Sequence, residues 1–348
     1  MREARGRATL HAVAERAGVS LKTASNVVNG TGRMSDDTRR RVLAAIDDLD
    51  YKVNVAARSL TLGRTNAISL AVPTLKSPYL AELAEAFVED ARSRGYAVYV
   101  TTYPDDRADG SREYLRSFNP YLSDGLLLSM SEQGDLDADD LRVSFPVVAL
   151  GSRLTGGAVD RVTTDDVEDA RAATAYLFSR GSTRIAVVGA HSAFDESRIL
   201  NATEGNAEQR LRGIVQACQE QGAPLDPALI AVTGYDWTIG AGFRGAEELL
   251  ARGREFDGLL CLNDGLAIGA IWALREHGHR VPEDIQVIGF DNIEEAAYLS
   301  PALTSMDSRI EWIAKTALDR LIARIEGSQE PAEDIWAPSR LVPRGTTR

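Results

Sequence analysis

From residue 66 onward, the chain alternates short apolar segments with amphipathic stretches of helical periodicity. The apolar segments predict strands that are buried on both faces, and the intervening stretches predict helices that pack on a sheet. Such alternation indicates parallel sheets covered by helices on both sides. The predicted strands are 67–72, 97–102, 125–129, 147–150, 184–188, 229–232, 258–262 and 285–290, and the main predicted helices are 79–94, 165–180, 207–221, 243–252 and 266–277.

About eight strands over this length are more typical of two doubly wound subdomains than of one sheet. We expect an N-subdomain of about 66–163 plus 294–324 and a C-subdomain of about 164–293 plus 325–345. Ligands of such folds bind at the carboxyl ends of the strands. The expected binding site is therefore the cleft between the two subdomains.

Composition excludes several other classes of protein. The 348 residues are 44% hydrophobic and 26% charged, an ordinary globular balance. No apolar run approaches the ~20 residues of a membrane span, and no apolar segment of a secretory signal follows the first basic residues. Two cysteines and four histidines show no disulfide or metal-binding spacing. We expect a cytoplasmic protein with no metal, no cofactor and no membrane partner.

The net charge of −12 is unevenly distributed. Residues 1–65 hold 12 Lys and Arg against 7 Asp and Glu, whereas the rest holds 27 against 44. A basic N-terminal part attracts nucleic acid or another anionic partner, and an acidic remainder avoids non-specific contact with DNA.

The basic part contains three short helical patterns. Thr9, Ser20 and Ser35 are each suited to cap a helix, and Gly18 ends the first one. Two short helices joined by a tight turn, the second with a polar outer face, indicate a helix-turn-helix. A plain three-helix bundle with a solvated face has the same spacing. The positive charge and the polar face of the second helix favour DNA binding.

Residues 9–30 read TLHAVAERAGVSLKTASNVVNG and closely resemble the N-terminal signature of the LacI/GalR family of bacterial transcriptional regulators. The resemblance continues through 38–46, 49–51 and 54–60 and extends over essentially the whole chain. It implies an all-α helix-turn-helix head (1–52), a hinge helix and linker (53–65), and an effector-binding and dimerisation body (66–348). The implied body is α/β, similar to periplasmic sugar-binding proteins, with two doubly wound parallel-sheet subdomains.

The resemblance also implies roles in DNA binding. Leu21, Lys22 and Asn26 correspond to base-reading positions of the recognition helix. In the hinge, Ala57 allows close approach, Arg58 serves the DNA backbone and Leu60 is the minor-groove wedge; an ordinary linker helix is the alternative. Phosphate-contacting or positioning roles fall to Thr9, Ser20, Thr23, Ser25, Asn29, Tyr51 and Asn54. Ala24 and Asn26 depart from the family's usual residues, and the second departure leaves the operator sequence open.

In the body, polar residues follow the predicted strands where a cleft needs them. Each has a plain alternative, such as helix capping for Asp165 or core packing for Trp237. Together they match family positions that bind the effector: Ser77, Tyr79, Asp165, Arg210, Trp237, Asn263 and Asp291. Carboxylates, amides and a guanidinium suit sugar hydroxyls, and an aromatic face suits sugar C–H groups. Asp169 and the long connection 190–206 depart from the family pattern near the site.

The sequence therefore predicts a regulator, of the repressor type, that binds a pseudo-palindromic operator as a homodimer and responds to a small molecule of the sugar class. A sugar receptor without DNA binding explains the body but not the head. An NAD-linked enzyme would use Gly240, Gly242 and Gly245, which match G-x-G-x-x-G. However, these glycines begin several residues after the strand, so we interpret them as helix-entry and close-packing positions.

Overall fold

The structure is a computed structural model that describes residues 8–29, 31–52, 64–104, 109–130 and 132–348. The chain divides into two compact units, 1–65 and 66–348, and each is described by itself. We call them the head and the body.

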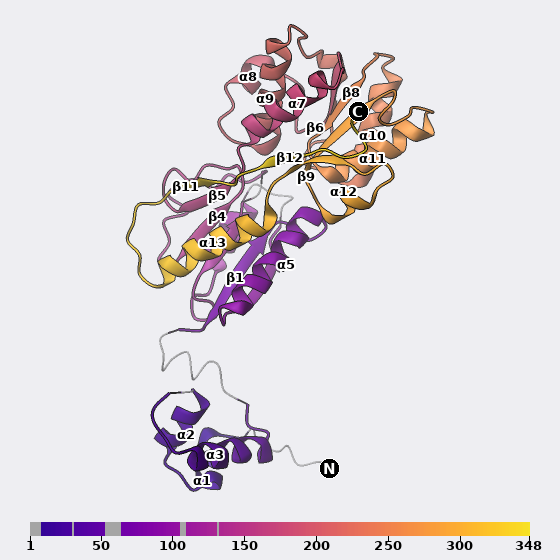
Figure 1. The fold of residues 1–348 in the computed structure, drawn as a ribbon. Coiled ribbons are helices and arrows are strands. Elements are labelled where there is room, and N and C mark those ends of the chain that lie inside the picture. Colours follow the sequence, from indigo (N-terminus) through magenta and orange to yellow (C-terminus); the bar gives the residue numbers. More distant parts are fainter. Residues whose placement is uncertain (1–7, 30, 53–63, 105–108, 131) are drawn as a thin grey trace, which may run out of the picture. The chain divides into compact units, whose positions relative to one another are not determined.

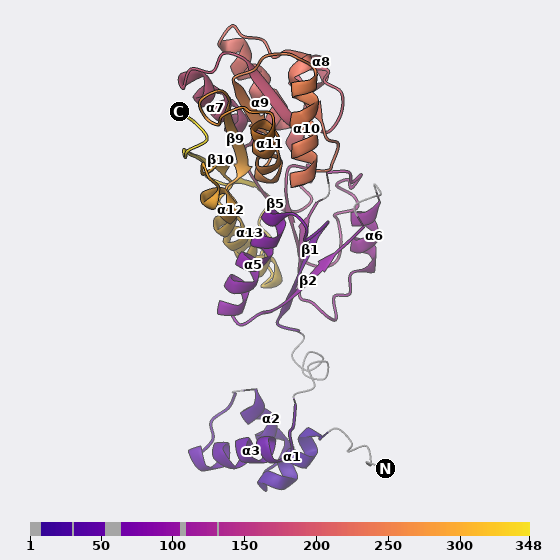
Figure 2. The same ribbon diagram turned by 90° about the vertical axis from the view of Figure 1, so that its right-hand side faces the viewer.

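The head is a helix-turn-helix unit (Figures 1 and 2). It contains α1 (Leu10–Ala17), α2 (Leu21–Val28) and α3 (Asp36–Asp48). As predicted, the side-chain oxygens of Thr9, Ser20 and Ser35 accept backbone N–H groups at the starts of these helices. Gly18 ends α1 in the left-handed conformation, with φ 63°. A small core around Val13, Ala24 and Val42, all fully buried, holds the three helices together.

The body has two sheets, and the predicted fold class is confirmed. The sheet of the N-subdomain has the strand order β11-β5-β4-β3-β1-β2 and is parallel throughout. Its strands are β1 (Ala67–Val72), β2 (Ala97–Thr102), β3 (Leu126–Ser129), β4 (Val147–Leu150), β5 (Asp160–Thr163) and β11 (Asp334–Trp336).

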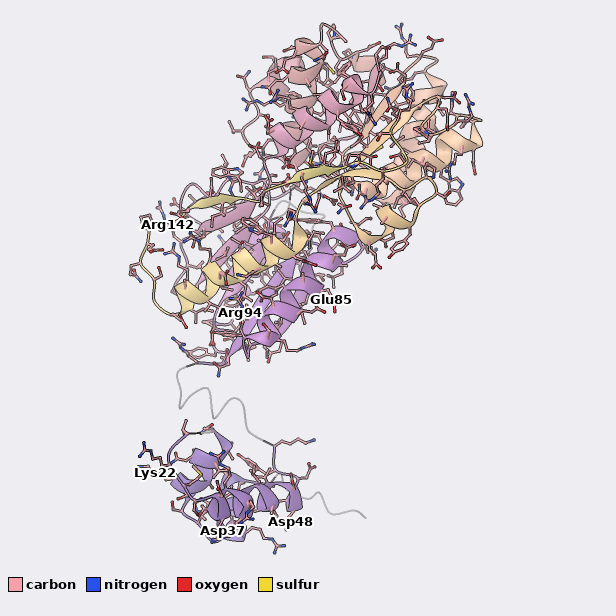
Figure 3. All side chains as sticks on the ribbon, viewed as in Figure 1. Lys22, Asp37, Asp48, Glu85, Arg94 and Arg142 are labelled. Carbon is pink, nitrogen blue, oxygen red and sulfur yellow. The ribbon has the colours of Figure 1, made fainter. Side chains whose placement is uncertain are left out.

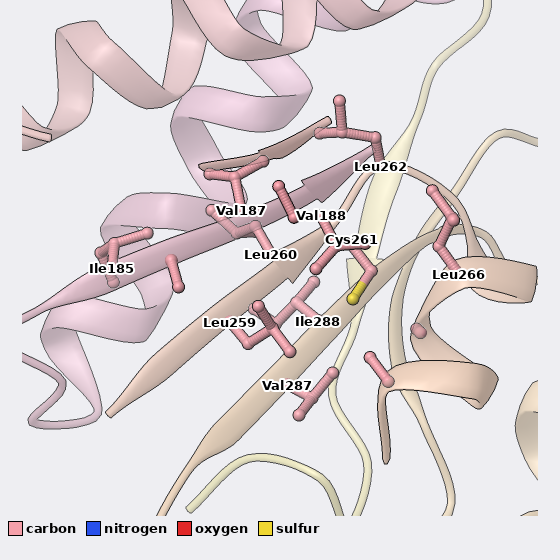
Figure 4. Close-up of a cluster of buried hydrophobic side chains, with 14 of the residues drawn as sticks. Ile185, Val187, Val188, Leu259, Leu260, Cys261, Leu262, Leu266, Val287 and Ile288 are labelled. Atoms are coloured by element: carbon pink, nitrogen blue, oxygen red, sulfur yellow. The ribbon is translucent and has the colours of Figure 1, made fainter. Parts of the chain in front are cut away.

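The sheet of the C-subdomain has the order β12-β10-β9-β8-β6-β7, with only the edge strand β12 antiparallel among the pairs described. Its strands are β6 (Ile185–Ala190), β7 (Ile230–Val232), β8 (Gly258–Cys261), β9 (Gln286–Asp291), β10 (Thr304–Asp307) and β12 (Arg340–Val342). The central strands are apolar throughout because helices cover both faces. Figure 4 shows their buried side chains, among them Val187, Leu260 and Ile288.

Helices flank both sheets, as the alternating pattern predicts. In the N-subdomain α5 (Pro78–Ser93) packs beside α13 (Ile310–Ile325) (Figure 1), and α6 (Gly110–Ser117) follows β2 (Figure 2). In the C-subdomain α7 pairs with α9, and α10 pairs with α11. The C-subdomain helices are α7 (Asp166–Ser179), α8 (Glu196–Leu200), α9 (Asn206–Glu220), α10 (Ile239–Ala251), α11 (Asp264–Glu276), α12 (Glu294–Tyr298) and the short 3₁₀ helix Pro227–Leu229.

The chain crosses between the subdomains after β5, after β10 and between β11 and β12. The predicted boundaries, 294–324 for the N-subdomain and 325–345 for the C-subdomain, differ from these crossings. Residues 294–307 stay in the C-subdomain because β10 pairs with β9, and β11 returns to the N-subdomain beside β5. The strands β10 to β12 have only three or four residues each and lack a long apolar run, so the sequence pattern does not reveal them.

The interpretation of the glycine motif as a packing feature is confirmed. A Cβ at Gly242 would lie 2.1 Å from the Leu266 carbonyl oxygen, and one at Gly269 would lie 1.9 Å from the Ile239 carbonyl oxygen. These glycines let the backbones of α10 and α11 approach closely. At Gly240 the nearest atom to such a Cβ is the end of the Arg244 side chain, at 3.4 Å, so the motif's first glycine is not confined.

We expect Gly242→Ala to lower the free energy of unfolding by about 2–3 kcal/mol, because the added methyl forces α10 away from α11. Gly240→Ala is the matched control in the same helix. It should leave stability unchanged or raise it by about 0.5–1 kcal/mol, because alanine is the better helix former. Urea denaturation of both variants checks this prediction, and equal losses would contradict it.

Candidate functional site

The outer face of α2 carries the predicted base-reading residues. Leu21 and Lys22 are exposed, and Lys22 lies at the surface of the head (Figure 3). Asn26 is half-buried and packs against Gly32, where a Cβ would lie 2.8 Å from its Nδ2 atom. The second helix therefore presents a long apolar side chain, a cation and an amide, which suit thymine methyl groups, guanine and adenine respectively.

The predicted phosphate-contacting residues form hydrogen bonds within the head. Thr9 and Ser20 cap helices, and the hydroxyls of Ser20 and Thr23 lie 2.8 Å apart. Asn29 Nδ2 donates to Ser25 Oγ at 3.2 Å. These hydrogen bonds fix the positions of the hydroxyl and amide groups at the start and end of α2.

Tyr51 packs against the core of the head. The hinge predictions at Asn54, Ala57, Arg58 and Leu60 lie outside the described residues.

Sequence reasoning also missed Arg41, whose guanidinium donates to the carbonyls of Ala17 and Gly18 and so caps the end of α1. The run of three arginines gives no signal that one of them has this role.

The body contains a cavity of about 620 Å³ between its subdomains, at the carboxyl ends of the strands. Ser77, Tyr79, Arg210, Trp237, Asn263 and Asp291 all line it, so the structure brings together six of the seven predicted effector-binding residues. The seventh, Asp165, does not line it. Its side chain is exposed and caps α7 by accepting the Glu168 N–H at 3.1 Å.

Of the two neighbouring aspartates at the start of α7, Asp166 lines the cavity and Asp165, the predicted residue, does not. Asp166 Oδ1 accepts from Arg210 Nε at 2.7 Å, and both side chains are almost completely buried. Arg210 also donates to the Leu262 carbonyl oxygen at the end of β8. Burial lowers the pKa of the guanidinium, but the carboxylates of Asp166 and Asp291 outweigh this effect and raise it. Arg210 is therefore a fixed cation inside the cavity.

Asp291 reaches the cavity because the backbone after β9 is unusual. Asp291 has φ 103° and Asn292 has φ 58°, a conformation that non-glycine residues rarely adopt. The fully buried carboxylate of Asp264 holds this turn by accepting from the Ile293 N–H at 3.0 Å and from Ser305 Oγ at 2.7 Å. Burial raises the pKa of Asp291 to about 7, although Arg210 opposes the shift.

Trp237 and Asn263 form one wall of the cavity. The indole Nε1 of Trp237 donates to the Gly189 carbonyl at 2.9 Å, which fixes the ring, and the Arg210 guanidinium lies 5.7 Å from the ring centroid. Asn263 caps α11 through Oδ1, and its Nδ2 donates to the Trp237 carbonyl at 3.1 Å. Asn263 therefore positions Trp237 and the start of α11 as well as lining the cavity.

The N-subdomain contributes Ser77 and Tyr79 from the start of α5. Tyr79 packs against the hydrophobic cores of both subdomains, and burial raises the pKa of its hydroxyl. Bonds between backbone and carboxylate also cross the cleft. The Asn206 N–H donates to Glu132 at 3.1 Å, and the Glu294 N–H donates to Glu82 at 2.8 Å. The two subdomains therefore meet around the cavity.

Sequence reasoning missed Glu132, His191 and Tyr235, which also line the cavity. All three lie on loops after strands: Glu132 follows β3 of the N-subdomain, and His191 and Tyr235 follow β6 and β7 of the C-subdomain. They belong to no motif, and their position after a strand was the one available signal. Within the part of the chain that the structure describes, no cluster of His, Cys, Asp and Glu could hold a metal ion.

Comparison with known proteins gives two family matches. Residues 9–54 match the family of bacterial regulatory proteins named after lacI, and residues 174–347 match a periplasmic binding protein-like domain. The chain is 33% identical over 341 residues to the HTH-type transcriptional repressor PurR of Erwinia tasmaniensis, covering 97% of this chain and 96% of that protein. The chain belongs to the LacI family.

Solved structures of LacI-family proteins agree with this assignment. A LacI-type transcription regulator from Bifidobacterium animalis subsp. lactis is 33% identical, with a TM-score of 0.76 over 80% of this chain and 99% of that one. The lac repressor dimer bound to operator and the anti-inducer ONPF is 25% identical, with a TM-score of 0.83 over 98% of this chain and 99% of that one.

Membership of the LacI family makes the chain a DNA-binding transcriptional regulator of the repressor type. The alternative of an NAD-linked enzyme is wrong, because the full-length relatives are regulators and Gly242 packs against α11. A receptor without DNA binding is also wrong, because the head matches the family's regulatory domain. Among the described helices, none has both the length and the apolar character needed to span a bilayer.

Two carboxyl groups, the half-buried one of Asp169 and the buried one of Asp291, predict how stability depends on pH. Burial raises the pKa of Asp169 to about 7, and that of Asp291 likewise. The folded state therefore binds these protons more tightly than the unfolded state. The two protonated carboxyl groups stabilise the folded state fully below about pH 4, and this stabilisation is lost as the pH rises through 7. We expect the melting temperature of the ligand-free body to fall between pH 5 and pH 8.

Asp169→Asn should flatten this dependence, since the amide does not titrate, and should raise the melting temperature by several degrees at pH 8. Thermal unfolding at pH 5, 6, 7 and 8 measures it. Asp284→Asn is the control, because Arg280 lowers the pKa of this half-exposed carboxylate to about 2 and its titration lies outside the range. An Asp169→Asn curve parallel to that of the wild type would contradict the assignment.

Proposed function

We propose that the protein binds a pseudo-palindromic operator as a homodimer and that a sugar in the interdomain cavity controls its affinity for DNA. The observation that supports the sugar most directly is the arrangement of Arg210, Asp166 and Asp291 beside the Trp237 ring. A fixed guanidinium and two carboxyl groups provide donors and acceptors for adjacent hydroxyls. The indole provides an apolar face for the C–H side of a sugar ring.

The position of the cavity supports control by domain closure. Its lining comes from both subdomains, so an effector that contacts both favours one angle between them. That angle sets the separation of the two segments that lead to the heads of the dimer. An inducer lowers the affinity for DNA and a corepressor raises it. Both act through the same coupling between the cavity and the heads, with opposite sign.

Exposed apolar side chains on the body support a second copy of this chain as partner. Tyr99 and Val100 are exposed on β2, a strand at the edge of its sheet, and Trp272 on α11 is 60% exposed. Large apolar residues and strand edges that stay open to solvent are features of interaction surfaces. A dimer would also present two heads to the two halves of an operator.

Lys22→Ala should weaken binding to the specific operator by about 1–3 kcal/mol, because Lys22 is the exposed cation on the outer face of α2. Arg39→Ala is the matched control: it removes the same charge from the exposed surface of α3. Fluorescence anisotropy on an operator selected from random DNA measures both variants. Equal losses at every salt concentration would mean that Lys22 contributes only its charge and would contradict its base-reading role.

Asp291→Ala should abolish the response of operator binding to the effector while operator affinity itself stays within about twofold of wild type. The reason is that Asp291 lies in the cavity of the body and the DNA face lies in the head. Anisotropy on operator DNA, titrated with a sugar panel, tests this. Asp165→Asn is the control, since that side chain caps α7 outside the cavity and should leave the response intact. Loss of DNA binding in Asp291→Ala would count against the assignment.

A further inference from the structure

One wall of the cavity is a row of neighbouring groups whose aromatic rings are tilted by 35° and 37° to one another. The Arg210 guanidinium lies 5.7 Å from the Trp237 ring centroid, and the Trp237 centroid lies 5.3 Å from that of His191. Tyr235 continues the row, with its centroid 4.3 Å from His191. The inner part, Arg210 and Trp237, serves the site described above. The outer part, His191 and Tyr235, has no role there.

The outer part also has its own hydrogen-bonding groups. Glu132 is half-buried, and its carboxyl oxygens accept from Ser152 Oγ at 2.7 Å and from the Asn206 N–H at 3.1 Å. A carboxylate has lone pairs for more than two partners, so Glu132 can also accept from a ligand hydroxyl. His191 Nδ1 lies 3.2 Å from Glu208, which leaves Nε2 as the ring nitrogen that can reach a ligand.

The inner and outer parts have different contacts. Arg210 is paired with Asp166, whereas His191 lies against Glu208 and the Tyr235 ring. The Trp237 ring lies next to both Arg210 and His191 and is the group that the two parts share.

The charges of the lining point to an uncharged ligand. Arg210 is already paired with Asp166, and Asp236 is paired with Arg244 at 2.9 Å. Among the described lining residues, Glu132 and Asp291 then remain as carboxyl groups and Lys76 as a cation. A phosphorylated sugar would place its negative charge beside these two carboxyl groups and would find no unpaired guanidinium, which disfavours it.

We propose that His191, Tyr235 and Glu132 form a second sugar subsite, so that the effector is an uncharged disaccharide or longer oligosaccharide. One ring occupies the Arg210–Asp291 subsite against Trp237, and the next ring lies on Tyr235 and His191 with a hydroxyl donating to Glu132. The cavity of about 620 Å³ falls in the range of ~300–1,000 Å³ typical of small-molecule sites. The inference rests on the proposed sugar effector.

Isothermal titration calorimetry of the full chain tests the subsite. The probes are glucose, galactose, maltose, cellobiose, lactose, melibiose, glucose 6-phosphate and hypoxanthine. We expect one neutral disaccharide to bind at least tenfold more tightly than its component monosaccharides and glucose 6-phosphate not to bind.

Tyr235→Ala should then weaken that disaccharide about tenfold and leave the monosaccharide within about twofold, because only the outer ring loses its stacking surface. Tyr235 is half exposed, so the variant retains the fold. Glu132→Gln should also weaken the disaccharide selectively. Tyr121→Ala removes the same side chain from an 81% exposed position outside the cavity and should change neither ligand.

The outcomes separate this inference from the proposed function. If a monosaccharide binds as tightly as any disaccharide, or if Tyr235→Ala weakens both equally, the second subsite is wrong and the sugar effector stands. If hypoxanthine alone binds, or no sugar of the panel does, the proposed sugar effector fails and the subsite fails with it. Asp291→Ala should abolish both sugars, since the inner subsite is common to them.

Discussion

The site in the body depends on one buried carboxylate, that of Asp264. Its two oxygens bind the backbone after β9 and the Ser305 hydroxyl on β10, and it begins α11 at the end of β8. Three neighbouring strands are thereby fixed to one group. The same carboxylate explains Gly289, where a Cβ would lie 2.1 Å from Asp264 Oδ1. In the left-handed turn that directs Asp291 into the cavity, Asp264 accepts the Ile293 N–H and Ser305 Oγ accepts the Asn292 N–H, so these backbone donors stay bonded.

The architecture was predictable from the sequence because several independent patterns indicate the same fold. Buried strands alternate with amphipathic helices, caps stand at the helix starts, and polar residues follow the strands. The error at Asp165 shows where such reasoning ends. Adjacent residues at a helix start differ in direction by roughly 100°, so one of two neighbouring aspartates caps the helix and the other enters the cavity. No pattern distinguishes them, but the position of Arg210 in the fold does.

The other features that the sequence did not predict were missed for a similar physical reason. Strands β10 and β11 are short and partly polar, and only their pairing with β9 and β5 makes them strands. Glu132, His191 and Tyr235 lie on loops, where the chain has no periodicity from which a direction could be inferred. His191 and Tyr235 follow the neighbouring strands β6 and β7, whereas Glu132 comes from the other subdomain and lines the same cavity only because the two subdomains meet there. Local sequence determines secondary structure well, but it does not determine which loops meet across a cleft.

The repeated crossing of the chain also determines the order in which the protein can be completed during synthesis. The core of the N-subdomain contains Ile68 from the first strand together with Leu321 from α13 and Ala337 beyond β11. A nascent chain therefore cannot finish this subdomain until nearly all of the body has left the ribosome, whereas the head is built only from early residues. A chain that stops early would consequently have a complete DNA-reading head and no functioning sensor.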